Sequence, residues 1–153
     1  MSPRSAYLDG LTMLARRELS EAQVRQRLAR RRHDRDAIDE AVARLKEERA
    51  IDDLRTAGAI ARTETSIKSR GQLRSLRRIE SAGIASAIAK RAVDEVFATI
   101  DEEALLESAL ARRLRARERI EDDAEFARLY RYLIGQGFEA DRVVKTLEAR
   151  RRR

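Results

Sequence analysis

The side chains of this sequence that could perform acid–base or metal chemistry are few and scattered. His33 is the single histidine, and the chain has no cysteine that could join it as a nucleophile or ligand. Two carboxylate pairs, Asp52-Asp53 and Asp122-Asp123, stand where helices are expected to begin. Carboxylates in that position cap the free N–H groups of a helix. We therefore expect no catalytic residue, no metal and no cofactor, and a structural or solvated His33.

Glycine motifs point the same way. No glycine-rich phosphate loop and no nucleophile elbow occurs in the sequence. Gly135 and Gly137 are one residue apart, as in a dinucleotide-binding fingerprint, but they close a helix-like segment rather than open one. An enzyme is the least supported class of protein for this chain.

Basic side chains carry a more informative pattern. Lys and Arg total 34 against 27 Asp and Glu, so the formal net charge is +7, and only four of the 34 are lysines. Guanidinium groups match the geometry of carboxylates and phosphates, and a positive protein is attracted to nucleic acid or to an acidic protein surface. A genome rich in G and C would also enrich arginine, so the count alone identifies no partner.

One basic stripe lies between residues 65 and 79, where no acidic residue occurs. At about 100° per residue, a helix here would carry arginines on one face and Leu73, Leu76 and Ile79 on the other. This face and the run at 27–32 are candidate contacts for phosphate or acidic groups, and a merely solvated surface is the alternative. The candidate residues are Lys68, Arg70, Arg74, Arg77, Arg78, Arg27, Arg30, Arg31 and Arg32. A further run, 150–153, is expected to be a frayed basic tail.

The elements that position these side chains are expected to be helices. The chain has one proline and six glycines, with 42% hydrophobic and 4% aromatic residues. Abundant Ala, Leu, Arg and Glu with so few helix breakers favour an all-α fold. No stretch approaches the roughly 20 apolar residues of a membrane span. We expect no membrane association and no secretory signal, and the lack of cysteine suits a cytoplasmic protein.

The helix ends repeat along the chain. Gly83-Ile84 and Gly137-Phe138 each combine a glycine suited to a left-handed helix end with an apolar residue that packs back. Aligning them gives a three-helix unit of about 50 residues that occurs three times, with Arg32-His33 replacing the glycine pair in the first unit. Equivalent apolar residues are Leu28, Ile79 and Leu133, and also Val42, Val93 and Leu147.

A unit of this size buries little surface alone, so neighbouring units must stack. We predict an all-α fold of three tandem three-helix repeats, at 1–50, 51–100 and 101–153, stacked into an elongated, curved array. Ser20 and Gln23 form a capping-box pattern in the first repeat. Gly71 starts the fifth helix, where we expect a change to Ala to be milder than a change of Gly83 to Val. The first helix is expected to bury Tyr7, Leu8, Leu11, Leu14 and Ala15.

Four segments together resemble a known family. They are 14–31 (LARRELSEAQVRQRLARR), 50–62 (AIDDLRTAGAIAR), 70–84 (RGQLRSLRRIESAGI) and 129–147 (LYRYLIGQGFEADRVVKTL). In order and spacing they are similar to the bacterial RecX regulators of the RecA recombinase, over about residues 6–150. The chain departs from the usual family pattern at Arg32, where a glycine is usual, at Thr56, where an aromatic residue is usual, and at Arg78, where an acidic residue often stands.

The resemblance implies three tandem three-helix repeats and a protein without catalytic residues. It also implies a mainly negative regulator in DNA repair and the SOS response, which restrains the recombinase, ATPase and coprotease activities of RecA. The implied partner is the RecA nucleoprotein filament, with single-stranded DNA bound weakly or through RecA, and the chain acting as a monomer. No individual contact residue is transferred from the family to this chain.

A stand-alone nucleic-acid-binding helical module is the alternative. It would use the fifth helix as a reader, although no unit pairs a short turn with a helix rich in Asn, Gln and Ser. One measurement separates the two hypotheses. A regulator needs RecA for its effect, whereas a nucleic-acid-binding module binds DNA alone with a steep salt dependence.

Overall fold

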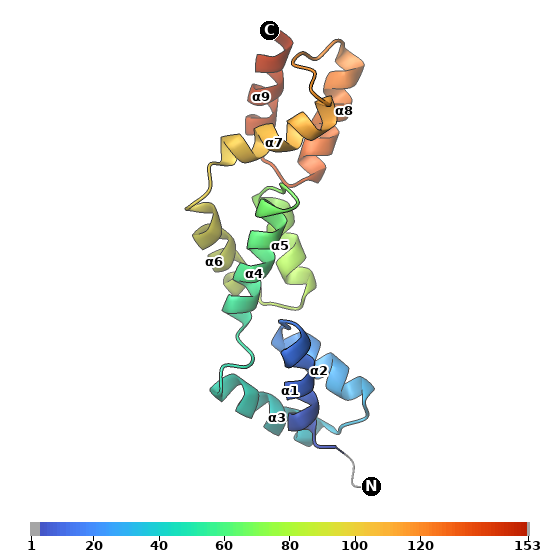
Figure 1. Cartoon of the computed structure of the whole chain (residues 1–153), viewed down its shortest axis with the longest axis vertical. Helices are drawn as coiled ribbons and strands as arrows, with labels where there is room; N and C mark the ends of the chain where they lie inside the picture. Colours follow the sequence, from blue (N-terminus) through green and yellow to red (C-terminus); the bar gives the residue numbers. More distant parts are fainter. Residues whose placement is uncertain (1–3, 153) are drawn as a thin grey trace.

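The chain forms a curved rod of helices stacked along one long axis (Figure 1). The structure, a computed structural model, describes residues 4–152. Over that range it contains nine α-helices and no strand, and the predicted all-α array of three-helix repeats is confirmed. The helices are α1 (Ala6–Arg16), α2 (Glu21–Arg30), α3 (Arg35–Glu47), α4 (Asp53–Ser66), α5 (Gln72–Ser81), α6 (Ser86–Phe97), α7 (Glu102–Leu114), α8 (Asp123–Gly135) and α9 (Ala140–Arg152).

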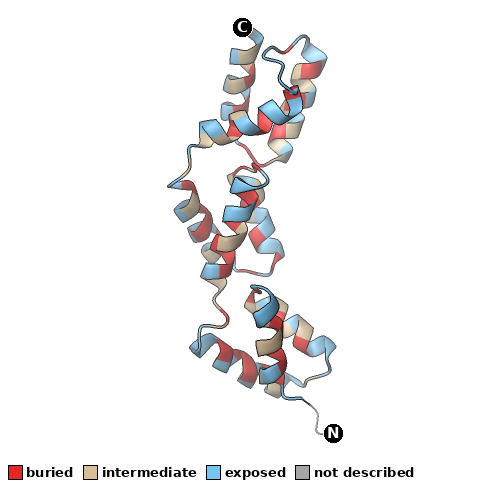
Figure 2. Ribbon diagram, in the orientation of Figure 1, coloured by how far each residue is buried: buried red, intermediate tan, exposed pale blue. Residues whose placement is uncertain are grey.

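Each group of three consecutive helices closes around its own core (Figure 2). The residues that the sequence aligns as equivalent are the ones that point inward. Leu28, Ile79 and Leu133 are each 0% exposed, and Val42, Val93 and Leu147 are 1%, 3% and 0% exposed. Ile51 packs into the first core and Leu105 touches the second and the third. The exact repeat boundaries at 50 and 100 stay a prediction.

Short polar side chains begin most of the helices. Ser20 accepts a hydrogen bond from the Gln23 N–H at 3.1 Å, and the Gln23 side chain accepts one from the Ser20 N–H at 3.0 Å, so the capping box is present. Carboxylates cap four more helices: Asp34 (α3), Asp52 (α4), Asp101 (α7) and Asp122 (α8). Each acidic pair of the sequence thus supplies a cap, which explains its position without a metal.

The second helices of the repeats, α2, α5 and α8, form a head-to-tail row. At one junction the C-terminal turn of α8 meets the N-terminus of α5. The Gly71 and Leu73 N–H groups donate to the Gln136 and Gly137 carbonyls at 2.8 and 3.1 Å. Free carbonyls at the end of one helix are therefore satisfied by free donors at the start of the next.

The junction between α5 and α2 has the same direction. The Ser20 hydroxyl at the start of α2 donates to the Ala82 carbonyl at the end of α5. A Cβ built on Gly83 would lie 2.5 Å from the Ala22 Cβ. Gly83 has a φ of +81°, so it provides both the predicted left-handed helix end and the close approach of the next helix.

Gly137 plays the same part after α8, with a φ of +97° and a Cβ position only 2.4 Å from the Arg74 nitrogen. Arg32, in the matching turn after α2, is also left-handed at 65°, but its side chain is exposed. The expectation that a change at Gly71 would be milder than one at Gly83 stays a prediction, but Gly71 also stands at a close contact. Its φ of −81° is ordinary, yet a Cβ there would lie 2.6 Å from the Gly137 carbonyl carbon.

The buried face of α1 differs from the predicted stripe. Leu8 is 48% exposed and Ala15 is exposed, whereas Asp9, Gly10 and Met13 are buried. The helix is rotated because Asp9 binds residues of the α2–α3 turn. Gly10 also lets α1 approach α3 closely, since its Cβ position lies 2.7 Å from the Leu45 Cδ1.

Two further expectations are corrected. On α5, Leu73 is 45% exposed and Ser75 is buried instead, donating to the Gly71 carbonyl at 2.9 Å. The basic run at the end of the chain is no frayed tail over its described part, because α9 continues to Arg152. Arg150 donates to Glu107 at 2.6 Å, and Arg151 pairs with Asp123.

Candidate interface: a basic band on the second helices

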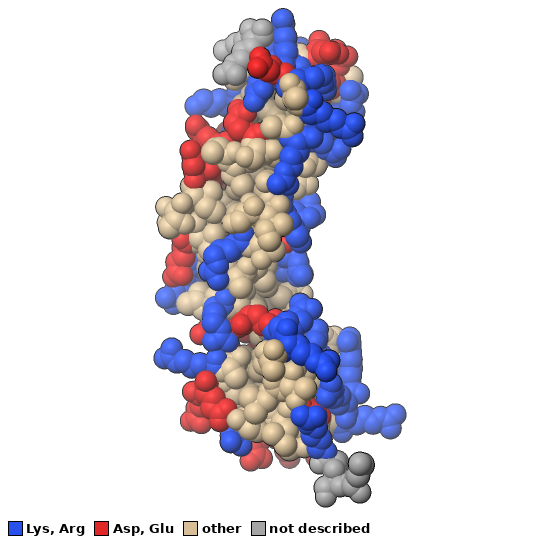
Figure 3. Space-filling view, viewed as in Figure 1, with Lys and Arg blue, Asp and Glu red and all other residues tan. Residues whose placement is uncertain are grey.

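The row of second helices carries arginines along one side of the rod. In Figure 3, basic side chains gather along the edge formed by α2, α5 and α8, whereas much of the acidic surface lies on the opposite edge. We define the basic band as seven exposed or half-buried arginines on these three helices. Its members are Arg27 and Arg30 on α2, Arg74, Arg77 and Arg78 on α5, and Arg128 and Arg131 on α8.

The positions of the band arginines recur from the second repeat to the third. Arg77 and Arg131 stand two residues before the buried Ile79 and Leu133, and Arg74 and Arg128 stand five residues before them. At about 100° per residue, both offsets place a side chain on the helix face turned away from the core. The corresponding residues of α2 are Gln26 and Gln23, so the second and third repeats are the more basic.

The band keeps its positive charge. None of its members forms an ion pair with a carboxylate of residues 4–152. Arg74 and Arg78 donate to neutral acceptors, the Gly135 carbonyl and the Ser81 hydroxyl, both at 3.2 Å. By contrast, Arg25 lies 2.6 Å from Asp39. Uncompensated guanidinium groups in a row suit an anionic partner.

Three of the predicted contact residues pair with carboxylates, two of them just before α5 and the third, Arg31, after α2. Lys68 and Arg70 lie between α4 and α5, not on the α5 face, and both face the buried carboxylate of Glu64 at 3.5 and 2.7 Å. Glu64 stands just before the segment 65–79, so the absence of acids within that segment did not reveal the pairing. Arg70 therefore stabilises the α4–α5 connection, and the helix itself contributes only Arg74, Arg77 and Arg78.

The turn after α2 divides its arginines between two environments. Arg31 lies 3.1 Å from Asp9 and the His33 Nε2 lies 2.7 Å from the same carboxylate, whereas Arg32 projects from an exposed left-handed position. The hydrogen bond with His33, helped by the charges of Arg31 and Arg4, outweighs burial and lowers the pKa of Asp9. His33 is thus a structural partner that ties this turn to α1.

Arg128 and Arg131 were missed by reasoning from sequence. They lie in a segment with acidic neighbours, Asp123 and Glu125, which can pair with arginines at helical spacing. In the structure the ion pairs of those carboxylates are with Arg151 and Arg117, and the charge of Arg128 adds only a smaller lowering of the pKa of Glu125. Alignment of the repeats would have identified them, because Arg128 and Arg131 occupy the positions of Arg74 and Arg77 in the second repeat.

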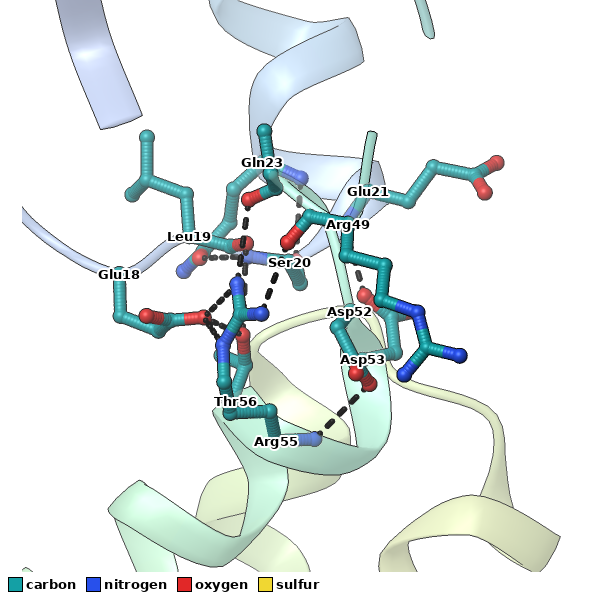
Figure 4. A network of polar contacts seen from close by, with 11 residues as sticks. Glu18, Leu19, Ser20, Glu21, Gln23, Arg49, Asp52, Asp53, Arg55 and Thr56 are labelled. Atoms are coloured by element: carbon teal, nitrogen blue, oxygen red, sulfur yellow. Dashed lines mark hydrogen bonds and ion pairs between the residues drawn. The ribbon is translucent and has the colours of Figure 1, made fainter. Parts of the chain in front are cut away.

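A polar network fixes the first repeat against the second (Figure 4). Arg55 of α4 donates to Glu18 at 2.8 Å and to the Arg49 and Ala50 carbonyls at 2.8 and 3.2 Å. Thr56 donates to the same Glu18 carboxylate at 3.0 Å. Because Glu18 lies in the short connection between α1 and α2, this network sets the direction of α2 and of its arginines relative to α5.

The described residues contain neither a metal-ligand cluster nor a membrane-spanning helix. No group of three His, Asp or Glu side chains among them is arranged to hold a metal. No helix within residues 4–152 has the length and apolar character needed to cross a membrane.

Comparisons with known proteins agree with this architecture. Residues 6–45 match the family model described as RecX, first three-helix domain. The structure is similar to the crystal structure of RecX from Lactobacillus salivarius, with a TM-score of 0.76, 19% identity and coverage of 94% of this chain and 95% of that one. A second crystal structure, of a regulatory protein RecX, gives a TM-score of 0.79 with 17% identity, over 94% and 70% of the two chains.

Sequence relatives extend the match along the chain. The regulatory protein RecX of Syntrophotalea carbinolica is 30% identical over 148 residues, covering 90% of this chain and 92% of the relative. That of Halorhodospira halophila is 29% identical over 134 residues, or 87% and 80%. That of Geobacillus kaustophilus is 27% identical over 145 residues, and this chain spans 53% of its length. Because this chain is 30% identical to the Syntrophotalea carbinolica protein over 90% of its length, it belongs to the RecX family of regulatory proteins.

Proposed function

We propose that this chain is a negative regulator of RecA that binds the RecA filament on single-stranded DNA and restrains its recombinase, ATPase and coprotease activities. Membership in a family of regulatory proteins supports the regulatory part of this proposal. The basic band supports the anionic filament as the surface that is bound. The observation that carries the proposal is that arginines without carboxylate partners recur on all three second helices along an extended rod.

The length and the charge of the rod both suit it to a filament. A nucleoprotein filament presents a long groove in which phosphates and acidic side chains recur. A curved rod with cations on each repeat can contact such a groove at several points, and several weak contacts on one rigid body bind far more tightly than one. A single chain, acting as a monomer in the cytoplasm, would then hinder movement of neighbouring RecA subunits without any catalytic residue.

The test compares two triple charge reversals that change the net charge equally. The band variant is Arg27→Glu, Arg77→Glu and Arg131→Glu, with one change on each second helix. The control variant is Arg35→Glu, Lys90→Glu and Lys145→Glu, with one exposed cation changed on each third helix. Charge reversal places like charges against the filament, so we expect inhibition of the RecA ATPase on single-stranded DNA to weaken at least tenfold in the band variant and little in the control.

Circular dichroism melting establishes that both variants fold, since exposed substitutions of this kind usually cost little stability. Inhibition by both triple variants that equals inhibition by the parent chain would show that the band is not the contact surface. Equal loss in both would show that only total charge matters. A regulator needs RecA for its effect. If the parent chain instead binds DNA alone with a steep salt dependence and does not inhibit the RecA ATPase, the regulator hypothesis fails and the stand-alone nucleic-acid-binding module replaces it.

A further inference from the structure

The two joints between the repeats are built from different kinds of contact. The first joint is the contact of α1–α3 with α4–α6, which the connection 48–52 spans, and the second is the contact of α4–α6 with α7–α9, which the connection 98–101 spans. Close helix packing occurs within each repeat rather than across either joint. The stiffness of the rod therefore depends on the few bonds that cross each joint.

Backbone groups and a shared apolar side chain hold the second joint. The Gly71 and Leu73 N–H groups at the start of α5 donate to the carbonyls that end α8, as described above. Leu105 packs against the cores of both the second and the third repeat. Bonds between the ends of two helices fix direction as well as distance. Dissolved salt screens charges and leaves such backbone and apolar contacts in place.

Side chains alone make the polar contacts of the first joint. Within residues 4–152, no backbone–backbone hydrogen bond joins α1–α3 to α4–α6, and the two cores have no apolar residue in common. The Ser20 hydroxyl donates across the joint to the end of α5. The Asp53 carboxylate accepts from the Glu21 N–H at 2.9 Å. The remaining bonds belong to the network around Glu18 and Arg55 (Figure 4).

Arg55 is the central side chain of that network. Its guanidinium group donates both to Glu18 and to the carbonyls of the connection 48–52, so a single side chain ties the first repeat to the chain segment about which it would turn. The Arg55 and Glu18 side chains are 44% and 38% exposed. Ion pairs with this exposure are weak and are screened by salt.

Free space surrounds the first joint. One hollow lies between Arg17 and Arg78, and another lies between Lys46 and Arg91. A hollow also borders the second joint, between Ser66 and Ser108, so space alone does not distinguish the two joints. The kind of bond distinguishes them, because the first joint loses its charged contacts when salt is added and the second joint keeps its backbone and apolar contacts.

We propose that the first joint is a latched hinge. The Glu18–Arg55 contact is the latch, and its opening lets the first repeat swing about the connection 48–52 while the second and third repeats stay one rigid unit. Arg27 and Arg30 of α2 move with the first repeat, so the hinge changes their spacing from the arginines of α5 and α8. This property belongs to the chain alone and goes beyond the proposed action on RecA.

Spin-label distances across the two joints test the hinge without RecA. The chain has no cysteine of its own, so labels attach only at cysteines that are introduced. Ala43→Cys with Lys90→Cys spans the first joint, and Lys90→Cys with Ala111→Cys spans the second. All three positions are exposed and helical. Double electron–electron resonance on the full chain gives a distance distribution for each pair, and its width measures the freedom of that joint.

Salt should act on the first joint only. In about 0.05 M sodium chloride, where charges are weakly screened, both distributions should be narrow. In about 1 M sodium chloride the screening length falls to about 3 Å, so the latch should open. The distribution across the first joint should then widen at least about twofold, as expected for a released hinge, and the one across the second should keep its width.

Arg55→Met should widen the distribution across the first joint already at low salt, because it keeps the apolar stem and removes the guanidinium contacts. Gln72→Met is the matched control at the second joint, where it removes a side-chain hydrogen bond to Glu102. Arg142→Met is the control for lost charge, since it removes an ion pair within the third repeat. Both controls should leave both widths unchanged. Circular dichroism reports folding, and the parent chain at high salt serves if Arg55→Met fails to fold.

Three results would overturn the proposal. Equal widening across both joints at high salt would mean that the whole rod loosens. A narrow distribution across the first joint at high salt and in Arg55→Met would mean that Ser20 and the close approach at Gly83 hold this joint without the latch. Widening across the second joint alone would place the hinge at the wrong end of the middle repeat.

Discussion

Asp9 is a buried carboxylate that joins α1 to the turn after α2. Arg4, Arg31 and His33 all lie within ion-pair distance of it, at 3.4, 3.1 and 2.7 Å. Hydrophobic periodicity predicted an apolar residue stripe on α1 and gave no sign of this cluster. The cluster makes the stability of the first repeat depend on one titrating group.

The pKa of Asp9 is lowered below its ordinary value of 3.8, so its contribution to stability is present above that pH and is lost as pH falls through the lower folded value. We expect Asp9→Asn to lower the free energy of unfolding at about pH 7, and the difference from the parent to shrink below about pH 3. Urea unfolding at both pH values measures this. Asp94→Asn, an exposed change on α6, should show little difference at either pH, and an Asp9 effect independent of pH would contradict the assignment.

The left-handed residues after α2 and α5 make a second prediction at this scale, with opposite signs. Gly83→Ala should destabilise by more than about 1 kcal/mol, because a Cβ is strained at positive φ and would also meet Ala22. Arg32→Gly should stabilise by up to about 1 kcal/mol, because it relieves the same backbone strain and the Arg32 side chain is exposed. Thermal or urea unfolding gives both values. A loss of stability in Arg32→Gly would mean that its side chain makes a contact that outweighs the strain.

At the scale of elements, Ser20 serves two helices at once. Its hydroxyl caps α2 by accepting from Gln23 and donates to the last turn of α5 at Ala82. Ser20→Ala should cost about 1–2 kcal/mol, since the cap and a buried inter-repeat hydrogen bond are both lost. Ser5→Ala removes a cap of the same kind that accepts only from Leu8. It should cost about half as much in urea unfolding, and equal costs would show that the bond to Ala82 contributes nothing.

Gly71→Ala tests the junction between α8 and α5. The substitution would place a Cβ against the Gly137 carbonyl and disturb the hydrogen bonds that join the two helices. We expect a destabilisation of at least about 1 kcal/mol, to which the poorer capping by Ala also contributes. Gly135→Ala, where a Cβ would meet nothing within 4 Å, is the matched control. Similar stability of the two variants would contradict tight contact at this junction.

What the sequence could predict at the element scale depends on how local the physical cause is. Caps such as Ser20 and Asp122, and the glycines at 83 and 137, follow from hydrogen bonds and backbone conformation within a few residues, so they were identified correctly. The buried face of α1 and the pairing of Arg70 with Glu64 depend on neighbours that only the folded chain brings close. The α8 arginines were missed for the same reason, because the side chains that engage nearby carboxylates come from other elements.

At the scale of the whole molecule, the stacked repeats predict an extended particle. A compact protein of 153 residues would have a radius of gyration of about 15 Å. Small-angle scattering of the parent chain should give a clearly larger value and a distance distribution with a long tail, as expected for the rod of Figure 1. A symmetric distribution with the compact radius would mean that the repeats fold back on one another in solution.

The head-to-tail row of second helices has a consequence for how such a protein could lengthen. The middle repeat carries both halves of the junction, Gly71 at the start of α5 and Gly83 at its end. A gene duplication of this repeat would place matching surfaces at every new boundary, and the inserted copy would dock as its template does. Duplication of the first repeat would instead present Arg32 where an incoming helix needs a glycine. The reach of the array along its partner would therefore grow by copying its interior, one repeat at a time.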